Sequence, residues 1–404
     1  MTDSSKRPHT FFLSSVHLKL LATLSVAPII MTNLGREFDL SRLEIKSWAV
    51  VMLLGTVVAA FVAGALSDAL GRRRTGLFAA GLLFVASLIS GFGGSYWIII
   101  AMALVIGCLV SIIDVNMDGY IGSLSKGRSA SGLFSRVQMT SDLMGAGLAL
   151  VFGVLSVSVA GSWRWFFFAM AALNLVTFLF AFRDYPQGAV VEKPFQKFFA
   201  HLKSGLGLLR QRAFLCVVAV ATFGSAATVA LVVEGPVYLG FSLHANPWVY
   251  GGTFAVMILM GFFGYVLSIQ LSRHCSPIVQ LIVGSAIMLL TGIAMTAAFY
   301  LAPGHTILFA IPMAITFGGH TIVTGSTLAA ATDIAQVDPT VGASMLTIFK
   351  RLISLLLGIL FLVLTLSGVV EGGLVLSVSV LVCGAGALVS SILCILWRVD
   401  PVDS

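Results

Sequence analysis

The chain has 404 residues, of which 58% are hydrophobic and only 10% are charged. This composition excludes an ordinary soluble globule and predicts a chain that crosses a membrane many times. The net charge of +7 is spread too thinly to indicate a nucleic-acid-binding surface. The five cysteines are scattered without a CxxC pair or a Cys/His cluster, so we expect no metal site, no disulfide framework and no bound cofactor.

Apolar runs recur along the whole chain, and each is close to the ~20 residues that a helix needs to cross ~30 Å of hydrocarbon. We expect spans near residues 13–34, 48–66, 75–93, 97–121, 131–159, 163–182, 213–240, 248–271, 278–300, 306–328, 342–367 and 373–397. The sequence therefore predicts an all-α integral membrane protein with twelve transmembrane helices.

The distribution of lysine and arginine predicts the orientation of these spans. Twelve spans place both ends of the chain on the same side of the membrane. The segments on that side contain Lys6, Arg7, Arg72, Arg73, Arg74, Lys126, Arg128, Arg183, Lys193, Lys197, Lys203, Arg210, Arg212, Arg273 and Arg398. Those on the other side contain Arg36, Arg42, Lys46 and Arg164. The positive-inside rule then places both termini in the cytoplasm, and we expect the protein in the cell inner membrane, surrounded by lipid and monomeric.

One long polar stretch, residues 183–212, interrupts the apolar runs and contains Pro186 and Pro194. We expect it to be a cytoplasmic linker with a short amphipathic helix around residues 195–209. It divides the chain into two six-helix halves, residues 1–182 and 213–404, which we expect to be related by pseudo-symmetry.

A short basic motif lies between the second and third expected spans. Its residues are Gly64, Asp68, Gly71, Arg72 and Arg73, in the pattern G-x-x-x-D-x-x-G-R-R. A loop this short forces two helices into an antiparallel hairpin, and consecutive arginines keep it on the cytoplasmic side. Any tight cytoplasmic turn capped by basic residues is the simpler interpretation.

This motif resembles the loop signature of the major facilitator superfamily of secondary transporters, and residues 264–274 resemble a degraded second copy. The resemblance implies the major facilitator fold and a gate in which Asp68 and Arg72 meet the Gly342 end of the eleventh span. Residues 232–240, and those from 317–320 through 342–345, look most like the drug:proton antiporters of the bicyclomycin/chloramphenicol-efflux type. The fourth-span arginine and the fifth-span Gly-Pro of such antiporters are both absent.

Charged residues at membrane depth are costly, so they mark wet cavities, ion pairs or proton sites. Asp114 and Asp118 are spaced i,i+4 and share one helical face, where repulsion and desolvation favour a proton on at least one of them. For Asp118 a salt bridge to a base in the following loop is the alternative. Asp142 and Glu234 are the other proton-coupling candidates, and Glu234 could equally be a wet outer cap just before Gly235-Pro236.

Four further residues are candidates for lining a substrate cavity. These are Arg136, His320, Lys350 and Arg351. Lys350 and Arg351 point about 100° apart around a helix, so at most one is expected to face the cavity squarely. For His320, a hydrogen-bonded packing role is the alternative to a cavity role.

These features predict a transporter and not an enzyme. We expect alternating access that moves a small molecule with protons, with proton-coupled efflux by antiport as the first interpretation. The alternative is proton-coupled transport of a specific anionic metabolite or siderophore, suggested by the buried cations. A channel or a membrane-embedded enzyme is a third class, for which the sequence contains no filter repeat, nucleotide loop or catalytic triad pattern.

Overall fold

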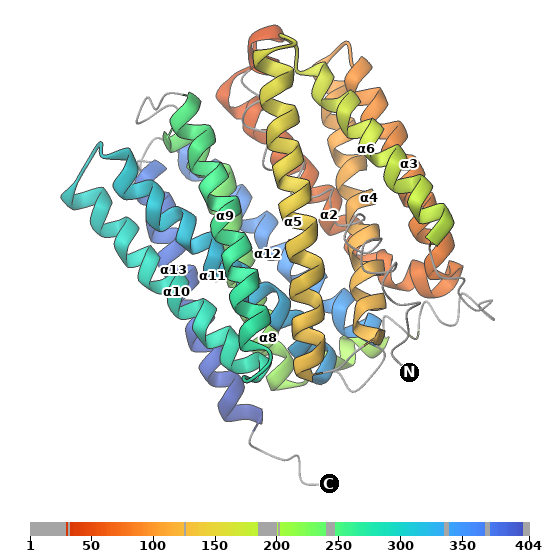
Figure 1. Ribbon diagram of the computed structural model, residues 1–404, viewed down its shortest axis with the longest axis vertical. Helices are drawn as coiled ribbons and strands as arrows, with labels where there is room; N and C mark the ends of the chain where they lie inside the picture. Colours follow the sequence, from red (N-terminus) through yellow and green to blue (C-terminus); the bar gives the residue numbers. More distant parts are fainter. Residues whose placement is uncertain are drawn as a thin grey trace. The chain divides into compact units, whose positions relative to one another are not determined.

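We analysed a computed structural model, which describes residues 30, 33–124, 127–184, 200, 203–239, 247–334, 339–367 and 372–398. Long helices account for most of these residues (Figure 1). They are α2 (Arg42–Leu70), α3 (Arg72–Phe92), α4 (Tyr96–Leu124), α5 (Gly127–Ser158), α6 (Arg164–Asp184), α8 (Arg212–Val237), α9 (Pro247–Leu271), α10 (Pro277–Leu301), α11 (Thr306–Ile334), α12 (Pro339–Ser367) and α13 (Gly372–Arg398).

Eight of the described helices contain a stretch long and apolar enough to cross a membrane. The stretches are Ser47–Ser67, Arg72–Phe92, Tyr96–Gly119, Arg212–Val232, Gly252–Leu271, Pro277–Leu301, Thr306–Ala331 and Gly372–Trp397. Seven of these stretches confirm the corresponding expected spans to within a few residues. The stretch in the span expected near residues 213–240 instead ends at Val232. Most of the first expected span lies outside the described residues. Of the linker helix expected around residues 195–209, residues 203–208 are described and are helical.

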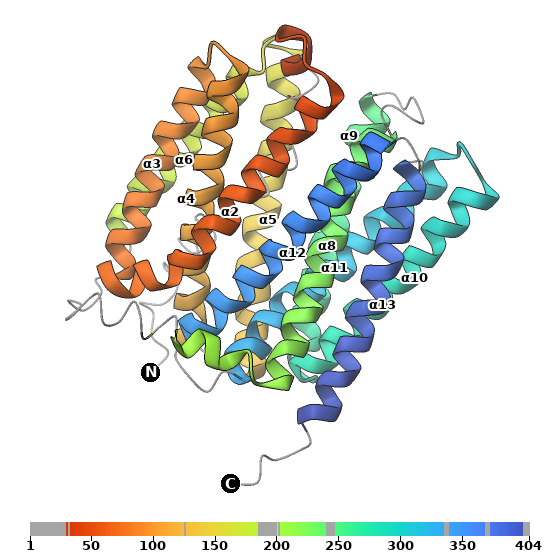
Figure 2. The same ribbon diagram turned by 180° about the vertical axis from the view of Figure 1, so that it is seen from behind.

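The chain divides into two compact units, and the division runs through two helices. The first unit contains Met1–Gly119 and Thr140–Lys203, and the second contains Tyr120–Met139 and Ser204–Ser404. In the first unit α3 packs along α6, and in the second unit α10 packs against both α11 and α13 (Figures 1 and 2). The start of α5 therefore belongs to the same unit as α8–α13, although it precedes them by many residues.

Local sequence signals set several helix ends. Ser41 and Glu44 form a reciprocal capping box at the start of α2, in which the Ser41 amide donates to Glu44 Oε2 over 2.7 Å. Between α2 and α3 a single residue, Gly71, turns the chain with a φ of 87°. This backbone conformation is costly for any residue with a Cβ atom, which explains why glycine stands at this position of the motif.

Glycines let helices cross closely in both units. A Cβ atom at Gly55 of α2 would overlap the carbonyl oxygen of Leu104 in α4, and one at Gly107 of α4 would overlap that of Met52 in α2. In the second unit, a Cβ atom at Gly264 of α9 would overlap the backbone of α11. Small residues at such crossings are the usual means by which membrane helices bring their backbones together.

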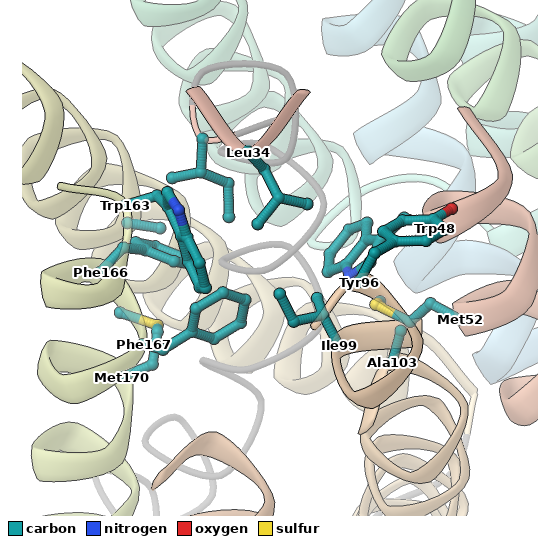
Figure 3. Packing of buried hydrophobic residues seen from close by; sticks show 12 residues of the cluster. Leu34, Trp48, Met52, Tyr96, Ile99, Ala103, Trp163, Phe166, Phe167 and Met170 are labelled. Carbon is teal, nitrogen blue, oxygen red and sulfur yellow. The ribbon is translucent and has the colours of Figure 1, made fainter. Parts of the chain in front are cut away.

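An aromatic core fills one end of the first unit (Figure 3). Its largest members are Leu34, Trp48, Met52, Tyr96, Ile99, Trp163, Phe166, Phe167 and Met170. Trp163 directly precedes α6, a position typical of membrane-interface tryptophans, but its side chain is 1% exposed and packs edge-on against Phe167. Trp97 and Trp165, in contrast, are largely exposed on the outside of the unit.

Trp163 is held by a charged pair at the same end of the unit. Arg164 donates two hydrogen bonds to the Glu37 carboxylate, over 2.9 and 2.7 Å, and Trp163 Nε1 donates a third over 2.7 Å. The Arg164 guanidinium also lies 4.5 Å from the centre of the Trp163 ring. The hydrogen bond from Arg164 is the main reason why the pKa of Glu37 lies below its ordinary value.

The substitution Glu37→Gln should lower the stability of the purified protein at neutral pH by about 0.5–1 kcal/mol, because both side chains are about one-third exposed and water screens the pair. A glutamine oxygen can still accept from Trp163, so the change removes mainly the charge. Since the folded-state pKa is depressed, this stabilisation exists above the unfolded pKa of about 4.3 and disappears as pH falls through the folded pKa.

Thermal unfolding in detergent, followed from pH 8 down to pH 4, measures this contribution. The wild type should unfold at a higher temperature than Glu37→Gln at neutral pH, with the difference shrinking in acid. Arg36→Gln, at an exposed neighbouring residue, is the matched control. A constant difference across the whole pH range would show that the carboxylate charge contributes nothing.

Candidate functional site

The G-x-x-x-D-x-x-G-R-R motif is held by two neighbouring helices of its own unit. The Asn116 amide in α4 donates to the backbone carbonyl of Arg72 over 2.8 Å. The Arg73 guanidinium donates to the carbonyl of Phe182 in the last turn of α6 over 3.0 Å. Because the last carbonyls of a helix have no partner within it and attract cations, this contact satisfies both groups. The motif is thus a fixed corner that joins α2, α3, α4 and α6.

Asn116 is a residue whose role the sequence reasoning missed. Its side chain is 0% exposed, and an amide in so apolar a helix was the available signal that it has a backbone partner. The Asp68 side chain lies outside the described side chains, so the gate between Asp68, Arg72 and the Gly342 end of α12 stays a prediction.

Asp114 and Asp118 lie on α4, one helical turn apart, and are 9% and 6% exposed. Ser111 precedes Asp114 by three residues and so lies on the same stripe of the helix. Its side chain is 0% exposed, and its hydroxyl has no hydrogen-bond partner among the described residues. This stripe therefore concentrates buried polar groups in a helix that is otherwise apolar. The side chain of Asp142 lies outside the described ones.

The three cationic candidates differ in burial. Arg351 of α12 is 6% exposed, whereas the adjacent Lys350 is half-buried. Arg136 of α5 is exposed, although its neighbour Ser135 is fully buried. The two cations on α12 thus have different surroundings, as expected from their 100° separation around the helix.

His320 lies on α11 and faces α8. Its Nε2 is 3.2 Å from the Thr324 hydroxyl, which also donates to the His320 carbonyl over 3.0 Å. The other ring nitrogen, Nδ1, packs against Gly224 of α8, where it would be 3.4 Å from an added Cβ atom. The half-buried Thr228 lies one turn beyond Gly224, on the same helix.

Glu234 is fully buried near the end of α8, beside the first turn of α13. One of its carboxylate oxygens would be 3.8 Å from a Cβ atom added at Gly372, the first residue of α13. The amides of a helix N-terminus attract a carboxylate, so this position suits a structural anion. Tyr238, one turn further on, packs against Gly373 and against the Phe309 ring of α11. The described helix continues past Pro236 to Val237.

Among the described residues, no group of three or more His, Cys, Asp or Glu side chains could hold a metal ion. Buried carboxylates, a buried arginine and a half-buried histidine, distributed over long apolar helices, are typical of a membrane transporter. The comparisons with known proteins support the same class.

The chain belongs to the Major Facilitator Superfamily, because the model of that family matches residues 13–350. Its fold is also similar to that of a solved proton:xylose symporter bound to 6-bromo-6-deoxy-D-glucose. The two structures superpose with a TM-score of 0.73 at 15% sequence identity, and the match covers 99% of this chain and 97% of the symporter chain. The all-α major facilitator fold is therefore confirmed, and with it the prediction that the chain is a transporter and not an enzyme.

Curated relatives match a shorter part of the chain. They include a D-xylose transporter of Levilactobacillus brevis, 30% identical over 30% of this chain. A facilitated glucose transporter of Xenopus laevis is 32% identical over 32%, and an inositol transporter of Arabidopsis thaliana is 26% identical over 31%. The matches span about a quarter of the relatives' own lengths, namely 26%, 22% and 22%. None of these three is a drug:proton antiporter, so the superfamily is shown and that branch is not.

Proposed function

We propose that this protein is a proton-coupled secondary transporter of a small polyhydroxylated solute of the sugar or polyol class. The observation that carries the coupling is the pair Asp114 and Asp118, two carboxylates one turn apart and almost fully buried in a membrane helix. Carboxylates at membrane depth are costly unless they serve a function, and a proton relay is one such function. A carboxyl that gains a proton on one side of the membrane and loses it on the other couples the cycle to the proton gradient.

The solute class is inferred from two sources. The three curated relatives are named for D-xylose, glucose and inositol, which are all small, neutral and rich in hydroxyl groups. The half-buried His320, Thr324 and Thr228 on α11 and α8 offer uncharged donors and acceptors of the kind that bind hydroxyl groups. Both observations favour a neutral polar solute over an apolar one.

Proton-coupled efflux of a partly apolar compound is the second candidate. It is favoured by the resemblance of residues 232–240 and 317–320 to the drug-efflux branch. The two candidates differ in the direction of coupling, since a symporter takes up solute with protons and an antiporter exchanges them.

The topology that we propose follows the basic residues. Residues 1–182 and 213–404 form the two halves, the 183–212 linker and both termini are cytoplasmic, and the protein lies in the cell inner membrane as a monomer. Asp68 and Arg72 then contribute to the cytoplasmic gate.

Uptake into proteoliposomes tests the proposal. Radiolabelled D-xylose, D-glucose and myo-inositol are offered with and without an inward proton gradient, beside a lipophilic dye and an organic acid. We expect at least one of the three polyols to accumulate only when the gradient is imposed. Gradient-driven movement of the dye alone would support efflux, and that of the organic acid alone would support the anionic alternative; either result would contradict the polyol proposal.

A further inference from the structure

Five uncharged polar side chains meet in the interior of the second unit. They come from four helices: Ser131 and Ser135 from α5, Ser268 from α9, Gln280 from α10 and Ser326 from α11. Each is 0% exposed. We call this group the serine–glutamine cluster.

Gln280 is the centre of the cluster. Its side-chain carbonyl oxygen accepts hydrogen bonds from Ser131 over 3.1 Å, from Ser326 over 3.0 Å and from Ser268 over 3.2 Å. The hydroxyl groups of Ser135 and Ser268 are 2.8 Å apart. One amide group thus links the start of α5 to three helices of the second unit.

Glycines bring the start of α5 close enough for these contacts. A Cβ atom at Gly325 of α11 would overlap the Ser135 hydroxyl and lie 3.2 Å from the Ser135 amide nitrogen. A Cβ atom at Gly132 of α5 would be 2.8 Å from the hydroxyl of Ser272, just beyond α9. The start of α5 is therefore fitted to this surface by its small side chains and by those of its neighbours.

The cluster lies close to the point on α5 where the two compact units meet in the chain. Within α5, the residues up to Met139 belong to the second unit and those from Thr140 onwards belong to the first, yet α5 is one continuous helix from Gly127 to Ser158. Alternating access changes how two parts of a transporter are arranged. Such a change must either bend α5 near residue 139 or release its start from α9, α10 and α11.

Accordingly, we infer that the serine–glutamine cluster is an uncharged latch, which holds the start of α5 in one state of the transport cycle and opens in another. This inference rests on the proposed function. Serine hydroxyls bond to water when exposed and lose little side-chain entropy when buried, so the latch can open and close at low cost. It has no charges to desolvate, unlike a gate built from Asp and Arg.

Cross-linking tests whether the latch must open. In a protein whose native Cys108, Cys216, Cys275, Cys383 and Cys394 are replaced by serine or alanine, the pair Ser135→Cys and Ser268→Cys is oxidised. Their hydroxyl groups are 2.8 Å apart, so the thiols can reach the ~2.05 Å of a disulfide. We expect oxidation to reduce transport about tenfold or more, and a reducing agent to restore it.

The control is a second buried serine pair of the same unit. Ser285 of α10 and Ser391 of α13 are 0% exposed, with hydroxyl groups 3.4 Å apart, and neither belongs to α5. The oxidised Ser285→Cys/Ser391→Cys protein should keep its transport activity. If the oxidised Ser135→Cys/Ser268→Cys protein transports as well as this control, the cluster is static packing and the latch is refuted.

A second measurement needs no substrate and so separates the latch from the proposed function. The rate at which N-ethylmaleimide labels Ser131→Cys in membranes reports how often the start of α5 is released. The change Gln280→Leu removes the shared acceptor of three hydrogen bonds and should raise this rate about tenfold. Transport cannot test the latch if both oxidised double-cysteine proteins are inactive, or if no transported solute is found. The labelling rate of Ser131→Cys is then the test, and an unchanged rate in Gln280→Leu refutes the latch.

Discussion

Replacing Asp114 by asparagine is expected to uncouple transport from the proton gradient while solute exchange continues. The carboxyl is 9% exposed on α4, with Asp118 one turn away, and asparagine preserves its shape but cannot bind or release a proton. For one proton per solute, a gradient of one pH unit supports about tenfold accumulation. We expect that accumulation in the wild type and none above equilibrium in Asp114→Asn.

Asp118→Asn is the matched comparison, because this carboxylate lies nearer the end of α4 and its charge can be balanced by the basic loop that follows. We expect it to retain most of the pH-driven accumulation. Flux in proteoliposomes, with and without an imposed gradient, measures all three proteins, and counterflow of labelled solute shows that the variants remain folded. Full pH-driven accumulation by Asp114→Asn would contradict the assignment of the proton site to Asp114. Asp118, Asp142 and Glu234 would then be the remaining candidates.

The second large effect is on stability, at the crossing of α2 and α4. Gly107→Ala should destabilise the protein by about 3 kcal/mol, because the new methyl group would overlap the Met52 carbonyl and lie 3.1 Å from the Thr56 amide nitrogen. Backbone atoms cannot turn aside as a flexible side chain can. The helices must therefore separate, which also disturbs the reciprocal contact of Gly55 with Leu104.

Gly147→Ala provides the control for this change. Gly147 lies in the middle of α5, and no described atom beyond its own helix is within 4 Å of the Cβ atom that alanine would add. This substitution should be neutral or slightly stabilising, because alanine favours helix more than glycine does. Thermal unfolding in detergent compares the two variants. Equal unfolding temperatures would show that the α2–α4 crossing accommodates a methyl group.

The sequence predicted the helices well because a membrane imposes a simple requirement on them. A span must be apolar for about 20 residues, so seven of the expected spans could be found within a few residues of their observed bounds. This signal is local in the chain. The one-residue turn at Gly71 was not predicted, because the expected spans end at residue 66 and begin again at residue 75, whereas the helices continue through the polar residues between them.

The parts that the sequence did not reveal depend on contacts between distant residues. Ser131 and Gln280 are 149 positions apart, and serine is so common in membrane helices that neither indicated the other. The buried indole of Trp163 donates to Glu37, 126 positions earlier, and nothing near Trp163 in the chain indicates this partner. The partner of Asn116, the Arg72 carbonyl, is a backbone atom, which leaves no trace in residue type.

The measurement that tests proton coupling most directly is the pH inside proteoliposomes loaded with a pH-sensitive dye. A transported polyol is added outside with no proton gradient present, and its entry is followed in parallel with labelled solute. Symport predicts that the interior becomes more acidic as the solute enters, and that Asp114→Asn abolishes this change. Solute entry with no change in internal pH in the wild type would contradict proton coupling, and an alkaline shift would contradict symport and support antiport.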